Sequence, residues 1–128
     1  MSRTRVLIVD DDPTFRSLLE VTLRRDYLVS VAVSGEEAFG KAIEWKPDAI
    51  ILDQEMGDGW NGVETLRKFR QHFLLKAVPV IMCTADNSRT TVLCSLEADA
   101  SDYVVKSSFS ADVVIAKVAR AVTRPAHI

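Results

Sequence analysis

The chain has 128 residues, enough for one domain with a substantial hydrophobic core and too few for two. Its net charge of −2 shows none of the excess of basic residues that nucleic-acid binding requires, and no apolar run approaches a membrane span. Its two cysteines lack metal-ligand spacing and suit a reduced protein better than a disulfide framework. We therefore predict one globular cytoplasmic domain that binds neither nucleic acid nor membrane directly.

Strand-like and helix-like segments alternate five times along the chain. Apolar runs predict strands at 6–9, 27–33, 49–52, 80–83 and 103–105. Between and after these runs, helical periodicity and capping residues predict helices beginning near Pro13, Ser34, Gly62, Arg89 and Ser110. Because the strand runs do not alternate with polar residues, we expect a parallel sheet covered by helices on both faces.

The first helix is predicted in most detail. Five residues fall at helical spacing on one face and are expected to point inward: Phe15, Leu18, Leu19, Thr22 and Leu23. Before the second helix, Ser34 and Glu37 have the spacing of a capping box.

Four of the predicted strands end in groups suited to phosphate chemistry. The first strand is followed by Asp10-Asp11-Asp12, and the others end at Asp53, Thr84 and Lys106. In an open parallel sheet the carboxyl ends of the strands border one crevice, where such folds bind ligands. The sequence therefore places carboxylates, a hydroxyl and an ammonium group at one site.

These motifs resemble those of the receiver domain of two-component response regulators. The similar segments are Val-Asp-Asp-Asp-Pro (9–13), Leu-Asp-Gln-Glu-Met (52–56), Cys-Thr-Ala (83–85) and Asp-Tyr-Val-Val-Lys (102–106). The resemblance runs from residue 6 to about residue 122. It implies a flavodoxin-like three-layer α/β sandwich with a parallel five-stranded sheet of order 2-1-3-4-5. It also implies a single receiver domain over 1–124, with 125–128 as a tail or the stub of a linker.

The resemblance implies a magnesium-dependent phosphoacceptor site. Asp53 would be the phosphoacceptor. Asp11 and Asp53 would ligate Mg²⁺ directly together with the main-chain carbonyl of Glu55, and Asp10 would act through coordinated water. Converging carboxylates repel one another, and a hard divalent cation relieves that repulsion.

The resemblance also implies how the phosphoryl group is held and sensed. Thr84 and Lys106 would hold the phosphoryl oxygens, and Thr84 with Tyr103 would form the conformational switch. The phosphoryl donor would be a histidine kinase or a histidine phosphotransfer protein. The switch would control a downstream effector protein or an output domain outside these 128 residues. Such a domain is a signalling module that catalyses only its own phosphorylation and dephosphorylation.

Three features depart from the family pattern. Gly57 stands where proline is usual, and Gly62 comes one residue late, which predicts a longer, more flexible loop with Trp60 near the phosphorylation pocket. Ser107 follows Lys106 where the family usually has a proline with a cis peptide bond. Glu55 and Asp86 occupy positions that tune the phosphoryl lifetime in the family.

Other functions remain open from the residues alone. A phosphorylation-independent adaptor would keep the fold and bind its partners constitutively. An aspartyl-nucleophile phosphatase would need an Asp-x-Asp motif after the first strand and an inserted cap, whereas this chain has Asp-Asp-Asp-Pro and no room for a cap. Flavin binding is disfavoured because acidic residues after the first strand would repel a phosphate without a metal.

Overall fold

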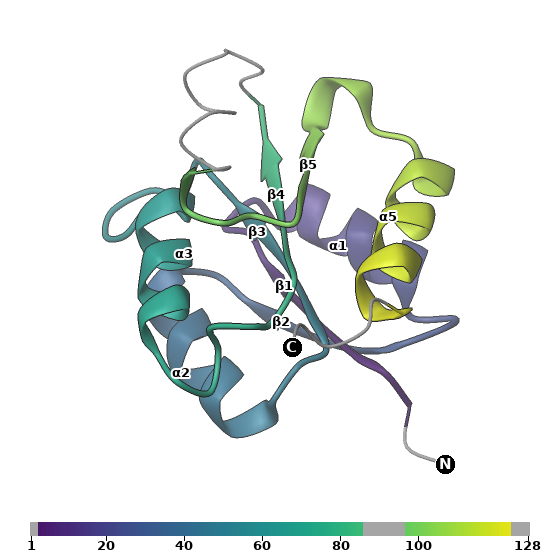
Figure 1. The fold of residues 1–128 in the computed structure, drawn as a ribbon. Coiled ribbons are helices and arrows are strands. Elements are labelled where there is room, and N and C mark those ends of the chain that lie inside the picture. The colour runs from purple at the N-terminus through teal and green to yellow at the C-terminus, as the bar shows by residue number, and fades with distance from the viewer. Residues whose placement is uncertain (1–2, 86–96, 124–128) are drawn as a thin grey trace.

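The computed structural model describes residues 3–85 and 97–123, which form a three-layer α/β sandwich around one parallel sheet (Figure 1). The strands are β1 (Arg5–Val9), β2 (Leu28–Ala32), β3 (Ala49–Asp53), β4 (Val80–Thr84) and β5 (Asp102–Val105). They are parallel and lie in the order β2-β1-β3-β4-β5. The predicted fold class and strand order are both confirmed.

Helices cover both faces of the sheet. They are α1 (Pro13–Leu23), α2 (Gly35–Trp45), α3 (Gly62–Gln71) and α5 (Ala111–Thr123), with a short 3₁₀ turn η1 (Lys106–Ser108) after β5. Figure 1 shows α2 and α3 on one face and α1 and α5 on the other. The helix predicted near residues 89–97 falls almost entirely outside the described residues. No helix in the described ranges is long and apolar enough to cross a membrane.

Each face of the sheet carries a hydrophobic core, and successive residues of the central strands point alternately into one core and the other. Leu7, Ile50 and Met82 pack with α2 and α3, whereas Ile8, Ile51 and Ile81 pack with α1 and α5; all six are at most 3% exposed. Side chains alternate across a strand, so a strand buried on both faces reads as a continuous apolar run. The double layer of helices thus explains the unbroken hydrophobic segments of the sequence.

The helix ends follow local chemistry. The Ser34 side chain accepts a hydrogen bond from the Glu37 amide at 3.1 Å, whereas the Glu37 carboxylate pairs with Lys41 at 3.7 Å. The full capping box instead begins α3, where Asn61 and Glu64 each accept from the other's amide. In α1, Phe15, Leu19 and Leu23 are buried as predicted.

Leu18 was expected on the inner face of α1, but it is 42% exposed. The buried stripe of α1 follows Phe15, Leu19 and Leu23 at four-residue steps, so the position one residue before Leu19 turns to the edge of the contact.

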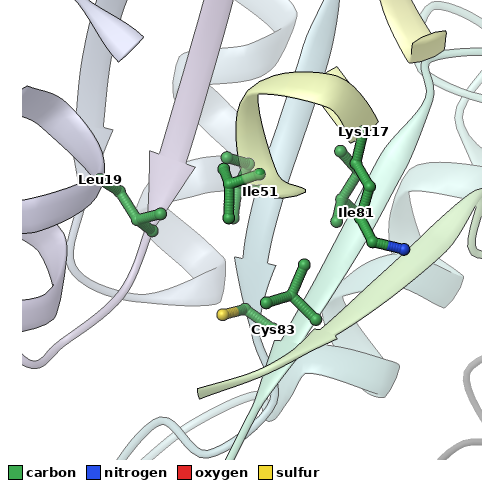
Figure 2. Close-up of a pocket in the computed structure, with 7 residues that line it drawn as sticks. Leu19, Ile51, Ile81, Cys83 and Lys117 are labelled. Atoms are coloured by element: carbon green, nitrogen blue, oxygen red, sulfur yellow. The ribbon is translucent and has the colours of Figure 1, made fainter. Parts of the chain in front are cut away.

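The core between the sheet and helices α1 and α5 contains one narrow gap (Figure 2). It is lined by Leu19, Ile51, Ile81, Cys83, Val104, Val114 and Lys117, and it is too small to hold a water molecule. Burial raises the pKa of the Cys83 thiol to about 12, so this cysteine is an inert part of the packing. The Lys117 ammonium leaves this apolar layer and pairs with Asp102 at 2.8 Å.

Gly62 fixes the approach of α3 to the end of β3. A Cβ atom on Gly62 would lie 2.6 Å from the carbonyl oxygen of Asp53 and 2.7 Å from the Cα of Gln54. The Gly62 amide also donates to the Gln54 carbonyl at 3.1 Å. Glycine at this position lets the helix start against the backbone that carries Asp53.

Gly62→Ala should therefore lower the free energy of unfolding by about 1–3 kcal/mol, the usual range for overpacking. Gly40 is the matched control, because no atom outside its own helical backbone and chain neighbours lies within 4 Å of a Cβ at that exposed position of α2. Gly40→Ala should raise the free energy of unfolding by about 0.5–1 kcal/mol. Urea unfolding of both variants measures the difference, and equal effects would contradict the steric account.

Candidate functional site

Three carboxylates meet at the carboxyl ends of β1 and β3. One ligand atom each from Asp10, Asp11 and Asp53 lies within 4.8 Å of the other two. Asp10 and Asp53 are each 1% exposed, whereas Asp11 faces solvent. The parallel register aligns Val9 of β1 with Leu52 of β3, and this brings the residues that follow them together.

Lys106 enters the carboxylate cluster from the end of β5. Its ammonium lies 3.0 Å from Oδ2 of Asp10 and 3.3 Å from Oδ1 of Asp53. The same nitrogen lies 4.7 Å from the centre of the Phe15 ring, so an aromatic face supports the cation from α1. Phe15 was not predicted as part of this site, because its helical spacing marks it only as a core residue.

The peptide bond between Lys106 and Ser107 is trans, as are all other peptide bonds in the described residues. Lys106 begins η1, and the Phe109 amide donates back to the Lys106 carbonyl at 3.2 Å. The Phe109 ring then packs edge-on against Phe15 at 5.5 Å. This turn keeps Lys106 directed at the carboxylates although the chain has serine where the family usually has proline.

The cluster contains more carboxyl groups than ammonium groups, and this shifts the pKa values of its members. Burial, then repulsion from Asp10, raise the pKa of Asp53 from 3.8 to about 8, although Lys106 opposes the change. Burial alone would lower the pKa of Lys106, but its hydrogen bond to Asp10 and the charge of Asp53 outweigh burial and raise it. One ammonium therefore does not compensate the buried carboxylates.

One buried oxygen of this cluster stands out. Oδ2 of Asp53 has no hydrogen-bond donor among the described residues, while Oδ1 contacts Lys106 and accepts from the Glu55 amide at 3.3 Å. Oδ2 of Asp10, by contrast, is satisfied by the Lys106 ammonium at 3.0 Å. Asp53 thus presents a buried side-chain oxygen that no donor among the described residues satisfies, beside two other carboxyl groups. Three carboxyl groups that meet beside a single ammonium offer the oxygen ligands that hard divalent cations prefer, so the residues fit Mg²⁺.

Thr84 lies at the end of β4 and is 2% exposed. Its hydroxyl donates a hydrogen bond to Oε1 of Glu55, and the Ala85 amide donates to Oε2 at 3.1 Å. From the sequence, Glu55 was expected to act through its main-chain carbonyl and its position two residues after Asp53. The reach of its side chain across to β4 is visible only in the structure.

Hydrogen bonds anchor the loop between β3 and α3 at both ends. The Gly57 amide donates to Oδ2 of Asp11 at 2.9 Å, a bond that a proline could not make. Near the other end, the Trp60 amide donates to Glu36 at 3.2 Å. Gly59 between them has a φ of 96°, which favours glycine. The extra residue is therefore accommodated between two fixed points.

The prediction that Trp60 lies near the phosphorylation pocket is wrong for its side chain. The indole packs edge-on against Phe39 of α2 at 6.0 Å, and Lys68 of α3 lies 5.4 Å from the ring centre. Phe39 and Lys68 offer the ring an aromatic and a cation–π contact between α2 and α3.

The remaining predicted residues lie at the edge of the site or outside the described residues. Tyr103 is 38% exposed and lies on β5, where its backbone pairs with Met82. Asp86 lies outside the described residues. The structure therefore brings together Asp10, Asp11, Asp53, Thr84, Lys106 and Glu55, with Tyr103 on the outer strand.

The similarity of this chain to known proteins covers the segments that carry these motifs. The family model for the response regulator receiver domain matches residues 6–119. The chain belongs to this family. The receiver is 36% identical to the transcriptional regulatory protein ResD of Bacillus subtilis over 89% of the chain. It is 35% identical over 91% of the chain to the DNA-binding response regulator MtrA of Mycolicibacterium smegmatis.

The receiver spans about half of these regulators, 46% of ResD and 49% of MtrA. Solved structures match over nearly their whole length. A putative response regulator from Chloroflexus aurantiacus gives a TM-score of 0.90 at 35% identity, covering 96% of this chain and all of that one. Chemotaxis protein CheY4 of Vibrio cholerae gives 0.87 at 28% identity, covering 94% and 99%. The receiver is thus a signalling domain of two-component systems.

The raised pKa of Asp53 predicts a pH-dependent stability. The unfolded chain releases this proton near its ordinary pKa of 3.8 and the folded chain only near 8. The folded state thus holds the extra proton, and the contribution of Asp53 to stability falls as pH rises through this window. In metal-free protein, Asp53→Asn should therefore gain stability over wild type as pH rises from about 4 to about 8, then level off.

Urea unfolding in the presence of a chelator, repeated across this pH range, measures the effect. Asp58→Asn is the control, because Asp58 is an exposed carboxylate in the same loop. A constant stability difference between wild type and Asp53→Asn at every pH would contradict the conclusion that the buried Asp53 has a raised pKa.

Proposed function

We propose that this receiver accepts a phosphoryl group on Asp53 in a magnesium-dependent reaction and that the acyl phosphate switches its conformation. The observation that carries the proposal is the bare Oδ2 of Asp53, buried beside Asp10 and within reach of Lys106. Once the cation has displaced the proton that the raised pKa retains, this oxygen is free to attack phosphorus, because no donor among the described residues holds it, while the contacts to Oδ1 hold the side chain in place.

In this reaction the Oδ2–P bond forms as the P–N bond of a phosphohistidine breaks. The imidazole keeps the electron pair of that bond and takes up a proton from solvent. Asp53 attacks as the carboxylate, so cation binding must first displace the proton that the raised pKa retains. The domain therefore catalyses only its own phosphorylation and the hydrolysis that reverses it.

Mg²⁺ would supply charge neutralisation for the carboxylates and for the phosphoryl oxygens when bound. Asp11 and Asp53 would ligate it directly with the main-chain carbonyl of Glu55, and Asp10 would act through water. Asp10 is well placed for this outer role, because its Oδ1 accepts from the Asp12 amide at 2.9 Å and its Oδ2 pairs with Lys106.

Lys106 and Thr84 would hold the phosphoryl oxygens. Transferred phosphoryl groups spread negative charge over their equatorial oxygens, and fixed donors stabilise that charge without reorganisation. Lys106 already contacts Asp53, and Thr84 lies buried at the end of the neighbouring strand. Lys106 is therefore already placed at the acceptor, whereas the Thr84 hydroxyl is close by but donates to Glu55.

The partners follow from the family. Receiver domains of response regulators interact with histidine kinases and carry output domains. We propose a cytoplasmic domain at 1–124 that receives its phosphoryl group from a histidine kinase or phosphotransfer protein, with 125–128 as a tail or linker stub. An effector protein or an output domain reads the switch. The relatives that are DNA-binding regulators are about twice as long, so a DNA-binding output would lie outside this chain.

The test is intact-mass analysis after incubation with a small-molecule phosphodonor. Wild type should gain one phosphoryl group with Mg²⁺ and none with a chelator, because the buried carboxylates need the cation. Asp53→Asn should gain none under either condition. Asp58→Asn, which leaves the cluster intact, should behave as wild type.

Magnesium binding without an adduct would contradict the proposal and favour the alternative, a phosphorylation-independent adaptor. In that case the loop carrying Gly57 and the Lys106–Ser107 turn would be the first features to restore to the family pattern.

Thr84 and Tyr103 would form the switch, since Tyr103 is partly exposed on the strand next to Thr84. Thr84→Ala should still be phosphorylated, but the Tyr103 ring should no longer respond, because the hydroxyl that follows the phosphoryl group is missing. NMR signals of the Tyr103 ring, recorded before and after phosphorylation, measure this. The same phosphate-dependent change in Thr84→Ala as in wild type would disprove the coupling.

A further inference from the structure

The Glu55 side chain crosses from the loop after β3 to the end of β4. Both of its oxygens are engaged there, Oε1 by the Thr84 hydroxyl and Oε2 by the Ala85 amide at 3.1 Å. Glu55 itself is exposed to solvent, so burial does not force the side chain into this position. The two donors hold the carboxylate in a bidentate manner.

The Thr84 hydroxyl and the Ala85 amide form an anion-binding site to which no cationic side chain of the described residues contributes. No ion pair among the described residues involves Glu55, and Lys106 is committed to Asp10 and Asp53. A hydroxyl and a main-chain amide that converge on an oxyanion are the donors that bind phosphoryl and other anionic groups. Glu55 thus fills the place where an oxyanion would bind.

We propose that Glu55 is an internal anionic ligand of the phosphoryl-oxygen site. Its carboxylate occupies the donors of Thr84 and Ala85 in the unphosphorylated receiver and must leave when the phosphoryl group arrives. This inference rests on the proposed function of Asp53 and names the group that regulates the same site. Glu55 acts through its side chain here, separately from its main-chain carbonyl.

Two physical effects follow from this arrangement. On phosphorylation, Thr84 and Ala85 would give up two charge-assisted hydrogen bonds to Glu55 and donate to the phosphoryl group instead. The loss of the bonds to Glu55 offsets part of the free energy gained from the bonds to the phosphoryl group. The released carboxylate then lies near a phosphoryl group of like charge, which further disfavours the phosphorylated state. Glu55 should therefore lower the affinity of the site for phosphoryl-like anions.

The experiment measures the affinity of the full chain for beryllofluoride, a phosphoryl mimic, in saturating Mg²⁺. Glu55→Ala should bind about tenfold more tightly than wild type, as expected when a charge-assisted hydrogen bond no longer has to be exchanged. Glu55→Gln should gain less, because its amide oxygen still accepts from Thr84 while its NH₂ group cannot accept from Ala85. Asp58→Asn is the matched control for removing one negative charge from the same loop and should bind as wild type.

A second readout follows the Ala85 amide by NMR before any mimic is added. Its signal should shift in Glu55→Ala and stay unchanged in Asp58→Asn, because Glu55 accepts from this amide. Wild-type affinity in Glu55→Ala would overturn the inference while leaving the proposed function intact. An equal gain in Asp58→Asn would overturn it as well, since general electrostatics would then suffice. If no variant bound beryllofluoride while its NMR spectrum remained folded, the proposed function would fail and this inference with it.

Discussion

The ion pairs of Lys106 with Asp10 and Asp53 are the interaction on which the rest of the site depends. They join the ends of β1, β3 and β5, three strands far apart in the sequence, and the two carboxyl groups that they contact are 1% exposed. Breaking such a pair leaves an uncompensated buried charge, which is more costly than leaving it formed. The Phe15 ring beneath the ammonium and the turn that follows β5 keep the cation in place.

The same pairs leave the site short of positive charge. One ammonium contacts two buried carboxylates, and Asp11 adds a third acidic group at the rim. The raised pKa of Asp53 and its bare Oδ2 are two expressions of this deficit. A divalent cation would relieve it, and a phosphoryl group would then find a nucleophile already in position. At the end of the neighbouring strand β4, Glu55 already accepts from the Thr84 hydroxyl and the Ala85 amide, donors that suit an oxyanion.

The sequence predicts the fold well because strands buried on both faces read as unbroken apolar runs, and because polar residues mark their carboxyl ends. The strand order and the roles of the site residues were predicted from the family resemblance, because hydrophobic periodicity carries no information about either. Contacts made by long side chains were not predictable. Glu55 reaches across two strands, Phe15 supports Lys106, and Trp60 turns to the α2–α3 surface because neighbouring elements offer those partners. The exposure of Leu18 likewise depends on how α1 is rotated against the sheet.

The most direct test of the account is an NMR titration of the Asp53 side-chain carboxyl carbon in metal-free protein and in saturating Mg²⁺. In metal-free protein the midpoint should lie near the raised pKa of about 8, because burial and Asp10 disfavour the carboxylate. With Mg²⁺ the midpoint should fall steeply, because the cation stabilises the charged form. A midpoint near the ordinary 3.8 in metal-free protein, unchanged by Mg²⁺, would contradict the claim that Asp53 is a buried carboxylate awaiting a cation.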